Sequence, residues 1–431
     1  MPVTADSTGE LAAPPSRTAT MLGGAFGNLI EWYDWTIYGL LASVFAGQII
    51  PANSPTTSLI AVLLTFGIGF LARPLGSILL SPMADRFGRR RMLSLTILMM
   101  GAGSLIVALT PPFAMVGIAA PISLLVARVL QGISTGGEFQ GSAVFLTEHA
   151  PARSRAFGSS GQMMSIGFAI LLATGTAALT TKLIPQPALS DWGWRIPFLF
   201  GALLSLFGVY VRRRLPETPA FEAAERKHEI VRNPLLAAIR EFPRESLLVF
   251  VMQASTVQFY IWTVFLPSYA HLAGNLPISD GLLGGTIALA VYTVGIPIFA
   301  KISDRIGRKP MLYANAIGFL VLVWPMLILL RNGDFTTFLI VDLIGILLIS
   351  ASNSALPAVL CELFPTRVRT SGIGLPYAIC SAIFGGTAPL IAAGLIAAKM
   401  DWGVPVYIMA ICAVTILVYR MMPETAGRSL E

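Results

Sequence analysis

Residues 85–90 read DRFGRR and residues 304–309 read DRIGRK, so one charged motif occurs twice in this chain of 431 residues. Three further pairs follow in the same order: EHAPARSR at 148–155 with ELFPTRVR at 362–369, DWG at 191–193 and 401–403, and PET at 216–218 and 423–425. Each second copy lies between 207 and 219 residues after the first. Four matches in one order at nearly one spacing predict two related halves of the same orientation.

The stretches between these motifs are strongly apolar. Hydrophobic residues make up 55% of the chain and charged residues only 12%, whereas soluble domains carry about 25% charged residues. A helix needs about 20 apolar residues to cross a bilayer. The pattern predicts membrane spans near 22–46, 57–82, 92–110, 116–146, 157–180, 195–211, 246–270, 281–300, 311–330, 336–360, 371–396 and 402–421.

The basic residues are distributed unequally between the two sides of these spans. Twenty-three of the 29 Lys and Arg residues fall on one side and four on the other. Because basic loops stay in the cytoplasm, both termini are expected there. The net charge of +7 therefore indicates membrane topology rather than nucleic-acid binding. The expected organisation is a cytoplasmic tail, a six-helix half, a cytoplasmic linker, a second six-helix half and a short tail, at residues 1–20, 21–211, 212–245, 246–422 and 423–431.

The fold class expected is thus an all-α integral membrane protein with twelve transmembrane helices in two parallel halves. No phosphate-binding loop is present, which argues against a primary ATP-driven pump. The three cysteines stand singly in apolar stretches, and the three histidines lack ligand spacing. We therefore expect no metal site, no catalytic residues and no cofactor other than a coupling proton.

Five ionisable residues lie well inside the predicted spans: Glu31, Asp34, Arg73, Arg128 and Glu138. Each charge at the centre of a bilayer costs about 2.5–3.5 kcal/mol even on the milder insertion scales. Five unpaired charges would cost roughly 12–18 kcal/mol, comparable to the whole stability of a typical protein at about 5–15 kcal/mol. These groups must therefore pair, face water or change protonation state.

Helical spacing places these groups on common faces. On the first span the shared face carries Asn28, Glu31, Asp34 and Tyr38, and on the fourth it carries Arg128, Gln131, Thr135, Glu138 and Ser142. We expect the first, second and fourth spans to enclose one wet cavity at mid-depth. The alternative is static ion pairing that locks these helices together.

The expected role of the carboxylates is to carry the coupled proton, with Asp34 first, then Glu138, then Glu31. An arginine that alternates between a carboxylate and the substrate would change the proton affinity of that carboxylate. The residues expected to bind an anionic substrate are Arg73 and Arg128, with Tyr38 and Gln131 on the same faces.

The second half carries no charge at mid-depth. Its candidates are Gln253 and Tyr260 on the seventh span and Tyr377 on the eleventh. They could supply hydrogen bonds and aromatic walls to a binding site. Any one of them is more often a packing residue than a ligand, so these candidates rest on position alone.

The chain resembles the major facilitator superfamily, whose best known signature is the loop motif at 85–91 and its second copy. Three further strings are similar to the metabolite:proton symporter branch: GNLIEWYD at 27–34, RVLQGISTGGE at 128–138 and WGWRIPF at 192–198. The resemblance implies two cytoplasmic charge clusters that act as a gate, formed by Asp85, Arg89 and Glu148 and by Asp304, Arg308 and Glu362.

The resemblance also implies alternating access in a bacterial inner membrane. Substrates known in this branch include 2-oxoglutarate, citrate, shikimate and proline or betaine. The two intramembrane arginines favour an organic acid, with a dicarboxylate as one option, over a zwitterionic compatible solute. A membrane-embedded enzyme or a sensor is the alternative from another class, but an enzyme needs neither the repeat nor the gate. We expect a monomer whose partners are a small organic solute, protons and membrane lipids.

Overall fold

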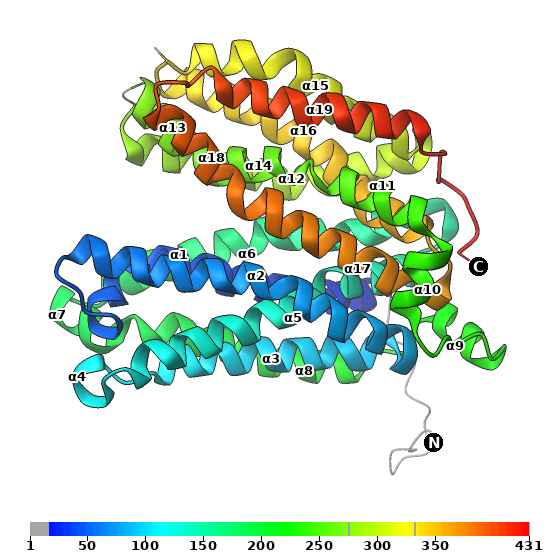
Figure 1. Cartoon of the computed structure of the whole chain (residues 1–431), viewed down its shortest axis with the longest axis horizontal. Coiled ribbons are helices and arrows are strands. Elements are labelled where there is room, and N and C mark those ends of the chain that lie inside the picture. Colours follow the sequence, from blue (N-terminus) through cyan, green and yellow to red (C-terminus); the bar gives the residue numbers. More distant parts are fainter. Residues whose placement is uncertain (1–16, 275, 332, 431) are drawn as a thin grey trace.

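The computed structural model describes residues 17–274, 276–331 and 333–430, and every regular element within these ranges is helical. Two bundles of long helices lie against one another along their length (Figure 1). The amino-terminal half contains α1 (Arg17–Ile49), α2 (Pro55–Phe87), α3 (Arg89–Leu109), α5 (Ala119–His149), α6 (Arg155–Leu183) and α8 (Arg195–Arg213).

The carboxy-terminal half repeats this plan with two interrupted spans. Its continuous helices are α14 (Ile278–Ile306), α15 (Arg308–Leu329), α16 (Phe335–Glu362) and α19 (Gly403–Met421). The seventh span is built from α11 (Pro243–Gln253), α12 (Thr256–Tyr260), η3 (Ile261–Phe265) and α13 (Leu266–Gly274). The eleventh is built from α17 (Arg369–Cys380), η5 (Ser381–Gly385) and α18 (Gly386–Ala397).

Twelve spans thus match the twelve apolar stretches expected from the sequence. By length and composition, ten of them qualify as membrane-crossing helices within the described residues. The other two are α1 and α5, and both carry ionisable side chains in their middle. The same charges that make these two helices less apolar supply the polar groups of the core.

Short helices complete the chain and connect the spans. They are α4 (Phe113–Val116), η1 (Ala152–Ser154), α7 (Gln186–Ala188), η2 (Leu189–Gly193), α9 (Pro219–Arg226), α10 (Pro234–Glu241) and η4 (Thr366–Val368). The helices α9 and α10 lie at the end of the bundle where α19 finishes and the chain terminates (Figure 1). We refer to this end as the linker end.

The linker expected at 212–245 begins inside a helix. Arg212 belongs to α8 and is only 1% exposed, so it is part of the amino-terminal half rather than of a solvated connector. The next residue, Arg213, ends the helix and is exposed. The seventh span starts at Pro243, close to the expected boundary.

The helices α2 and α5 pack at backbone distance in the amino-terminal half. A Cβ on Gly132 would lie 2.1 Å from the carbonyl oxygen of Gly69, and one on Gly136 would lie 2.1 Å from that of Arg73. Small residues at such contacts let membrane helices approach closely. This packing carries Arg73 on α2 up to the face of α5 that looks toward the second half.

The seventh and eleventh spans each contain one π-helical turn, η3 and η5, and the seventh is also interrupted by a turn at Ala254 and Ser255. Such π-helical turns occur preferentially at functional sites because they rotate the following helix and free a backbone carbonyl. Tyr260 directly precedes η3, and Ser381 begins η5. Both residues lie where the two halves meet.

Candidate functional site

Two small cavities lie between the halves at mid-length of the bundle. The larger measures about 40 Å³ and is lined by Trp32, Phe139, Met163, Ile166, Gln253, Ser255, Thr256, Phe259, Tyr260, Asn353, Leu356 and Tyr377. The smaller measures about 10 Å³ and is lined by Glu31, Trp32, Arg73, Thr135, Gly136, Phe139, Gln140, Tyr377 and Ala378. Since one water needs about 10–15 Å³, these spaces hold a few waters and no organic solute.

Glu31 and Arg73 are the two charged residues that line these cavities. They are 2% and 6% exposed, and each lies within electrostatic reach of the other. One carboxylate oxygen of Glu31 and Nε of Arg73 have no hydrogen-bond partner among the described residues. The guanidinium of Arg73 instead faces aromatic rings, 4.0 Å from the centre of Phe70 and 4.8 Å from that of Trp35. This pair is therefore buried, ionisable and incompletely satisfied.

Asp34 lies inside the amino-terminal half rather than at either cavity. Its Oδ2 accepts hydrogen bonds from the hydroxyl of Ser104 on α3 and, at 3.1 Å, from the amide of Gln131 on α5. Arg128 is within electrostatic reach of Asp34. The signal for Ser104 was absent from the sequence pattern, because a single serine in an apolar span is more often bonded to its own backbone.

Arg128 is fully buried, and none of its guanidinium nitrogens has a hydrogen-bond partner in the described ranges. It lies over the ring of Tyr38, 3.9 Å from the ring centre. The Tyr38 hydroxyl faces away, at 2.6 Å from the hydroxyl of Thr65 and 3.2 Å from the carbonyl of Val62. Arg128, Tyr38 and Gln131 thus form a buried cluster with Asp34 that does not line the cavities.

Glu138 is fully engaged by protein groups. Its two carboxylate oxygens receive Nη2 and Nη1 of Arg212 at 2.6 and 3.1 Å, and the Thr96 hydroxyl at 2.5 Å. Arg212 also donates to the carbonyls of Gly23, Gly24 and Leu93. The sequence placed Arg212 among the topology-setting basic residues, but the structure makes it the partner of Glu138.

The single wet cavity expected from the first, second and fourth spans therefore differs from the structure. Glu31 and Arg73 face the space between the halves, whereas Asp34, Arg128 and Glu138 are packed among helices of the amino-terminal half. The side chains expected on one face of α1 meet different neighbours, since Asn28 bonds to α6, Asp34 to α3 and α5, and Tyr38 to α2. Helical spacing could not tell which end of that face would meet the other half.

All three candidates from the second half line the larger cavity. Tyr377 stacks on Phe139 across the interface, with ring centres 4.1 Å apart. The amide of Gln253 lies 3.3 Å from the hydroxyl of Ser381 in the η5 turn. Tyr260 stacks against Trp32, with ring centres 6.4 Å apart. The two interrupted spans thus deliver the polar and aromatic wall of the site.

The residues expected to form the first charge cluster meet at the linker end. Arg89 lies 3.2 Å from Asp85 and 3.5 Å from Glu148, and all three side chains are fully buried. Asp85 also accepts hydrogen bonds from the backbone amides of Thr370 and Ser371, at 3.2 and 2.8 Å. These two residues begin α17, so a carboxylate of the first half caps a helix of the second.

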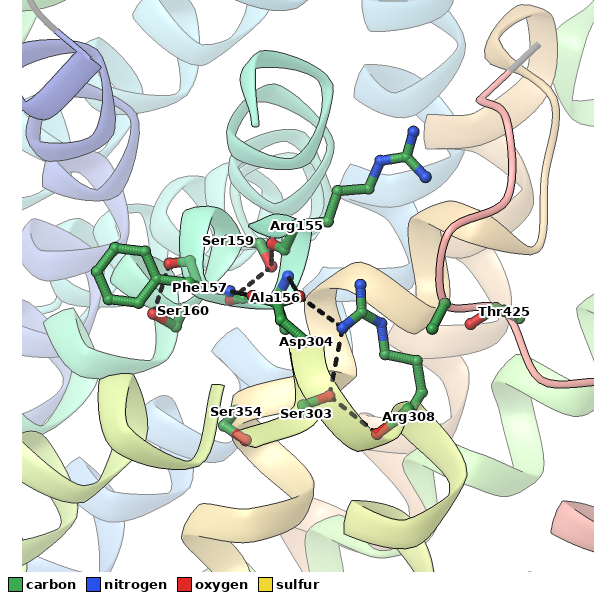
Figure 2. A network of polar contacts seen from close by, with 12 residues as sticks. Arg155, Ala156, Phe157, Ser159, Ser160, Ser303, Asp304, Arg308, Ser354 and Thr425 are labelled. Atoms are coloured by element: carbon green, nitrogen blue, oxygen red, sulfur yellow. Dashed lines mark hydrogen bonds and ion pairs between the residues drawn. The ribbon is translucent and has the colours of Figure 1, made fainter. Parts of the chain in front are cut away.

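The second cluster repeats this arrangement with the halves exchanged. Arg308 lies 2.7 Å from Asp304 and 3.1 Å from Glu362. Asp304 accepts from the backbone amides of Ala156 and Phe157 at the start of α6, at 3.0 and 2.9 Å (Figure 2). The carboxylate of a carboxy-terminal helix therefore caps a helix of the amino-terminal half.

Two arginines that the sequence did not single out complete the clusters. Arg369 reaches from α17 to Glu148, 2.5 Å away, and Arg155 reaches from α6 toward Glu362, 3.7 Å away. Both contacts join one half to the other. The sequence feature that could have identified them is their position, because each arginine is the last residue of a repeated string, 148–155 or 362–369.

The repeated PET strings supply the rest of the linker-end geometry. Glu217 accepts from the backbone amides that start α3, and Glu424 does the same for α15, at 2.9 Å from the amide of Arg308. The turns before these helices hold Gly88 and Gly307 with φ of 98° and 102°. Residues other than glycine rarely adopt these φ angles. A Cβ on Gly88 would also lie 2.3 Å from the Glu217 carboxylate. The glycine of each loop motif is thus explained.

Comparison with known proteins identifies the family of this fold. A sequence model described as Major Facilitator Superfamily matches residues 24–375 and 256–430. The chain belongs to the major facilitator superfamily. The structure of the superfamily proton:xylose symporter XylE bound to 6-bromo-6-deoxy-D-glucose superimposes with a TM-score of 0.78 at 18% identity, covering 96% of this chain and 97% of that one.

Curated relatives of this superfamily member align along almost the whole chain. A citrate-proton symporter of Klebsiella pneumoniae is 34% identical over 93% of this chain and 90% of its own length. The shikimate transporter of Escherichia coli is 32% identical over 97% of both chains. A glycine betaine, proline, ectoine and pipecolic acid transporter of Dickeya dadantii is 32% identical over 94% of this chain and 83% of its own. The resemblance to the metabolite:proton symporter branch is confirmed, and the protein is a multi-pass protein of a bacterial inner membrane.

Proposed function

We propose that this protein is a proton-coupled symporter that takes up a small organic acid by alternating access. The observation that carries the proposal is the pair formed by Glu31 and Arg73, buried together at a cavity between the two halves. At that position the carboxyl group can take up and release a proton while the guanidinium stays charged and binds an anion. The citrate-proton symporter and the shikimate transporter among the relatives support an organic acid.

The proposed transport unit is a single chain, because its cavity lies between halves of the same polypeptide. We assign the linker end to the cytoplasm, since the connectors rich in Arg and Lys meet there. The ion pairs of the two clusters hold this end closed. Substrate can enter only after the halves separate, because the cavities of about 40 and 10 Å³ admit only water.

Within this mechanism, Glu31 is the better candidate for the substrate-linked proton. Arg73 is attracted to its carboxylate, but the guanidinium keeps hydrogen-bonding capacity for a substrate carboxylate. A bound anion would compete with Glu31 for Arg73, which couples the proton occupancy of Glu31 to the substrate. Asp34 and Arg128 form their own cluster within the amino-terminal half, so a change in the protonation of Asp34 could be a second step of the same cycle.

A zwitterionic solute is the second candidate, and a specific feature favours it. The larger cavity is walled by the rings of Trp32, Phe139, Phe259, Tyr260 and Tyr377. Aromatic cages of this kind recognise quaternary ammonium groups. The betaine and proline transporter among the relatives agrees with such a substrate. An enzyme or a sensor has no comparable support, because these relatives are named as transporters.

Reconstituted uptake can separate these alternatives. Purified protein in proteoliposomes is offered radiolabelled citrate, succinate, shikimate or glycine betaine with and without an imposed inward proton gradient. We expect gradient-driven accumulation of at least one organic acid. Accumulation of glycine betaine alone would replace the first candidate by the second. A wild-type protein that ignores the gradient for every solute would contradict proton coupling.

Variants then test the pair. Glu31→Gln should abolish substrate accumulation driven by the proton gradient. It should retain exchange of labelled for unlabelled substrate, because binding persists without the titratable group. Arg73→Gln should lose both activities. Arg331→Gln is the matched control, since Arg331 lies outside these cavities and pairs with Asp401 at 2.5 Å. Normal coupling in Glu31→Gln would remove Glu31 from this role.

A further inference from the structure

A groove of about 290 Å³ opens on the outer face of the amino-terminal half, at the linker end. It lies between α3 and α8 and is lined by Arg90, Arg91, Ser94, Leu95, Leu98 and Arg213. These residues belong to neither charge cluster and to neither central cavity. The groove therefore needs an explanation of its own.

The groove has a charged mouth and an apolar floor. Arg91, Leu95 and Leu98 follow i, i+4 and i+7 on α3, which places them on one stripe of the helix. At a rise of about 1.5 Å per residue, Leu98 lies about 10 Å farther along the helix than Arg91. Leu95 and Leu98 are 37% and 41% exposed, so they face the surroundings of the bundle. Arg213 closes the mouth from the last turn of α8.

The cations of the mouth lack acidic partners within the described ranges. Arg91 and Arg213 are exposed and make no ion pair or side-chain hydrogen bond there, and the side chain of Arg90 donates only to the carbonyl of Leu215, at 3.0 Å. Glu217 lies close by, but its carboxylate is occupied by the backbone amides that start α3. The groove is therefore net positive and offers free guanidinium donors.

The internal repeat provides a comparison within the same molecule. In the second half, Lys309 and Pro310 stand where Arg90 and Arg91 stand in the first, and Tyr313 replaces Ser94. The ammonium of Lys309 donates to the carbonyl of Met422 at 2.8 Å, and the ring of Tyr313 packs edge-on against Tyr419. In the second copy, proline thus stands at the position of Arg91, and the lysine at the position of Arg90 is bound to a backbone carbonyl. Fold and topology alone do not require the arginines of the first copy.

We propose that this groove binds an anionic phospholipid. The phosphate would be held by Arg91 and Arg213, and one acyl chain would lie along Leu95 and Leu98. Guanidinium groups pair with phosphate oxygens in a bidentate geometry, and basic pockets between membrane helices bind anionic headgroups. A free inorganic anion would use the arginines but not the apolar stripe below them. The proposal does not depend on which solute is transported.

The test is native mass spectrometry of the purified full-length chain with added phosphatidylglycerol or phosphatidylcholine of the same acyl chains. Two double variants are compared with wild type: Arg91→Gln with Arg213→Gln, and Lys309→Gln with Arg420→Gln. Both remove two positive charges at the linker end. Arg420 precedes the second PET string by the same three positions as Arg213 precedes the first, so the second variant is a matched control.

We expect wild type and the control variant to retain phosphatidylglycerol in preference to phosphatidylcholine. The groove variant should bind phosphatidylglycerol about 30-fold more weakly, because each basic residue near a membrane surface contributes about five- to sixfold. Equal losses in both double variants would attribute the binding to overall charge and overturn the proposal. It would also be overturned if wild type showed no headgroup preference, or if millimolar inorganic phosphate displaced the lipid completely.

Discussion

Neutralising Glu148 should open the linker end of the bundle. Its Oε1 lies 2.5 Å from Nη1 of Arg369, and its Oε2 lies 3.5 Å from Nε of Arg89. Arg369 belongs to the other half, so this ion pair exists only while the halves are closed at this end. Arg89 belongs to the same half as Glu148, and that contact persists when the halves separate.

The size of the effect follows from the burial of the pair. Both side chains are fully buried, and removing one partner of a buried ion pair costs about 3–5 kcal/mol. Glu148→Gln should lie near the lower limit, because glutamine keeps the shape and Arg369 retains the carbonyls of Cys361 and Phe364 at 3.0 and 3.1 Å. A change of about 3 kcal/mol moves the equilibrium between closed and open states by about 100-fold.

A native cysteine reports the opening. Cys361 on α16 is fully buried beside Thr147 of α5, at the contact between the halves. In a background with Cys380→Ser and Cys412→Ser, the rate at which a maleimide labels Cys361 measures the open population. Glu148→Gln should raise this rate by about 100-fold while the closed state still predominates.

The matched control is Asp401→Asn, which also removes one acidic partner of an arginine. Asp401 pairs with Arg331 within one half, and both side chains are partly exposed. Such a surface pair contributes only about 0–1 kcal/mol, so labelling of Cys361 should stay at the wild-type rate. A folded Glu148→Gln protein with wild-type labelling would refute the view that this ion pair holds the halves together.

Three further predictions concern single residues. Asp34→Asn should abolish proton-driven accumulation in proteoliposomes without unfolding the protein; wild-type coupling would remove Asp34 from proton transfer. Gly88→Ala should lower the melting temperature, because its φ of 98° and ψ of 150° lie in a region essentially confined to glycine, which costs about 1–3 kcal/mol, and because the new Cβ would meet Glu217. Gly427→Ala, with φ of 78° and no atom within 4 Å of the new Cβ, should lose less. Burial of Glu424 opposes ionisation, but hydrogen bonds from backbone amides outweigh burial and lower the pKa of its carboxyl. The stabilisation by this carboxylate is therefore complete above the ordinary glutamate pKa and is lost as pH falls through the pKa of the folded state. In thermal melts, Glu424→Gln should lose less stability on acidification than wild type, and parallel pH curves for the two proteins would contradict this.

The sequence by itself determined the architecture. Apolar stretches of membrane-spanning length, four repeated strings and a one-sided distribution of basic residues left few arrangements other than two parallel six-helix halves. Apolar stretches of this length cross a bilayer as helices, because each backbone polar group must then be satisfied within its own segment. The structure adds the reason for the glycine of the repeated DRxGR motif, since only glycine takes the backbone angles found at Gly88 and Gly307 without strain.

Tertiary structure decided how the buried charges divide. The spacing on α1 places Glu31 and Asp34 on one face, yet only Glu31 reaches the space between the halves, while Asp34 meets Ser104 and Gln131 within its own half. The sequence placed Arg212 in a cytoplasmic connector, but in the structure Arg212 is buried and forms an ion pair with Glu138. Periodicity reports the direction in which a side chain leaves its helix. The tilt and depth at which two helices cross determine what that side chain meets, and these depend on packing between segments 70 or more residues apart.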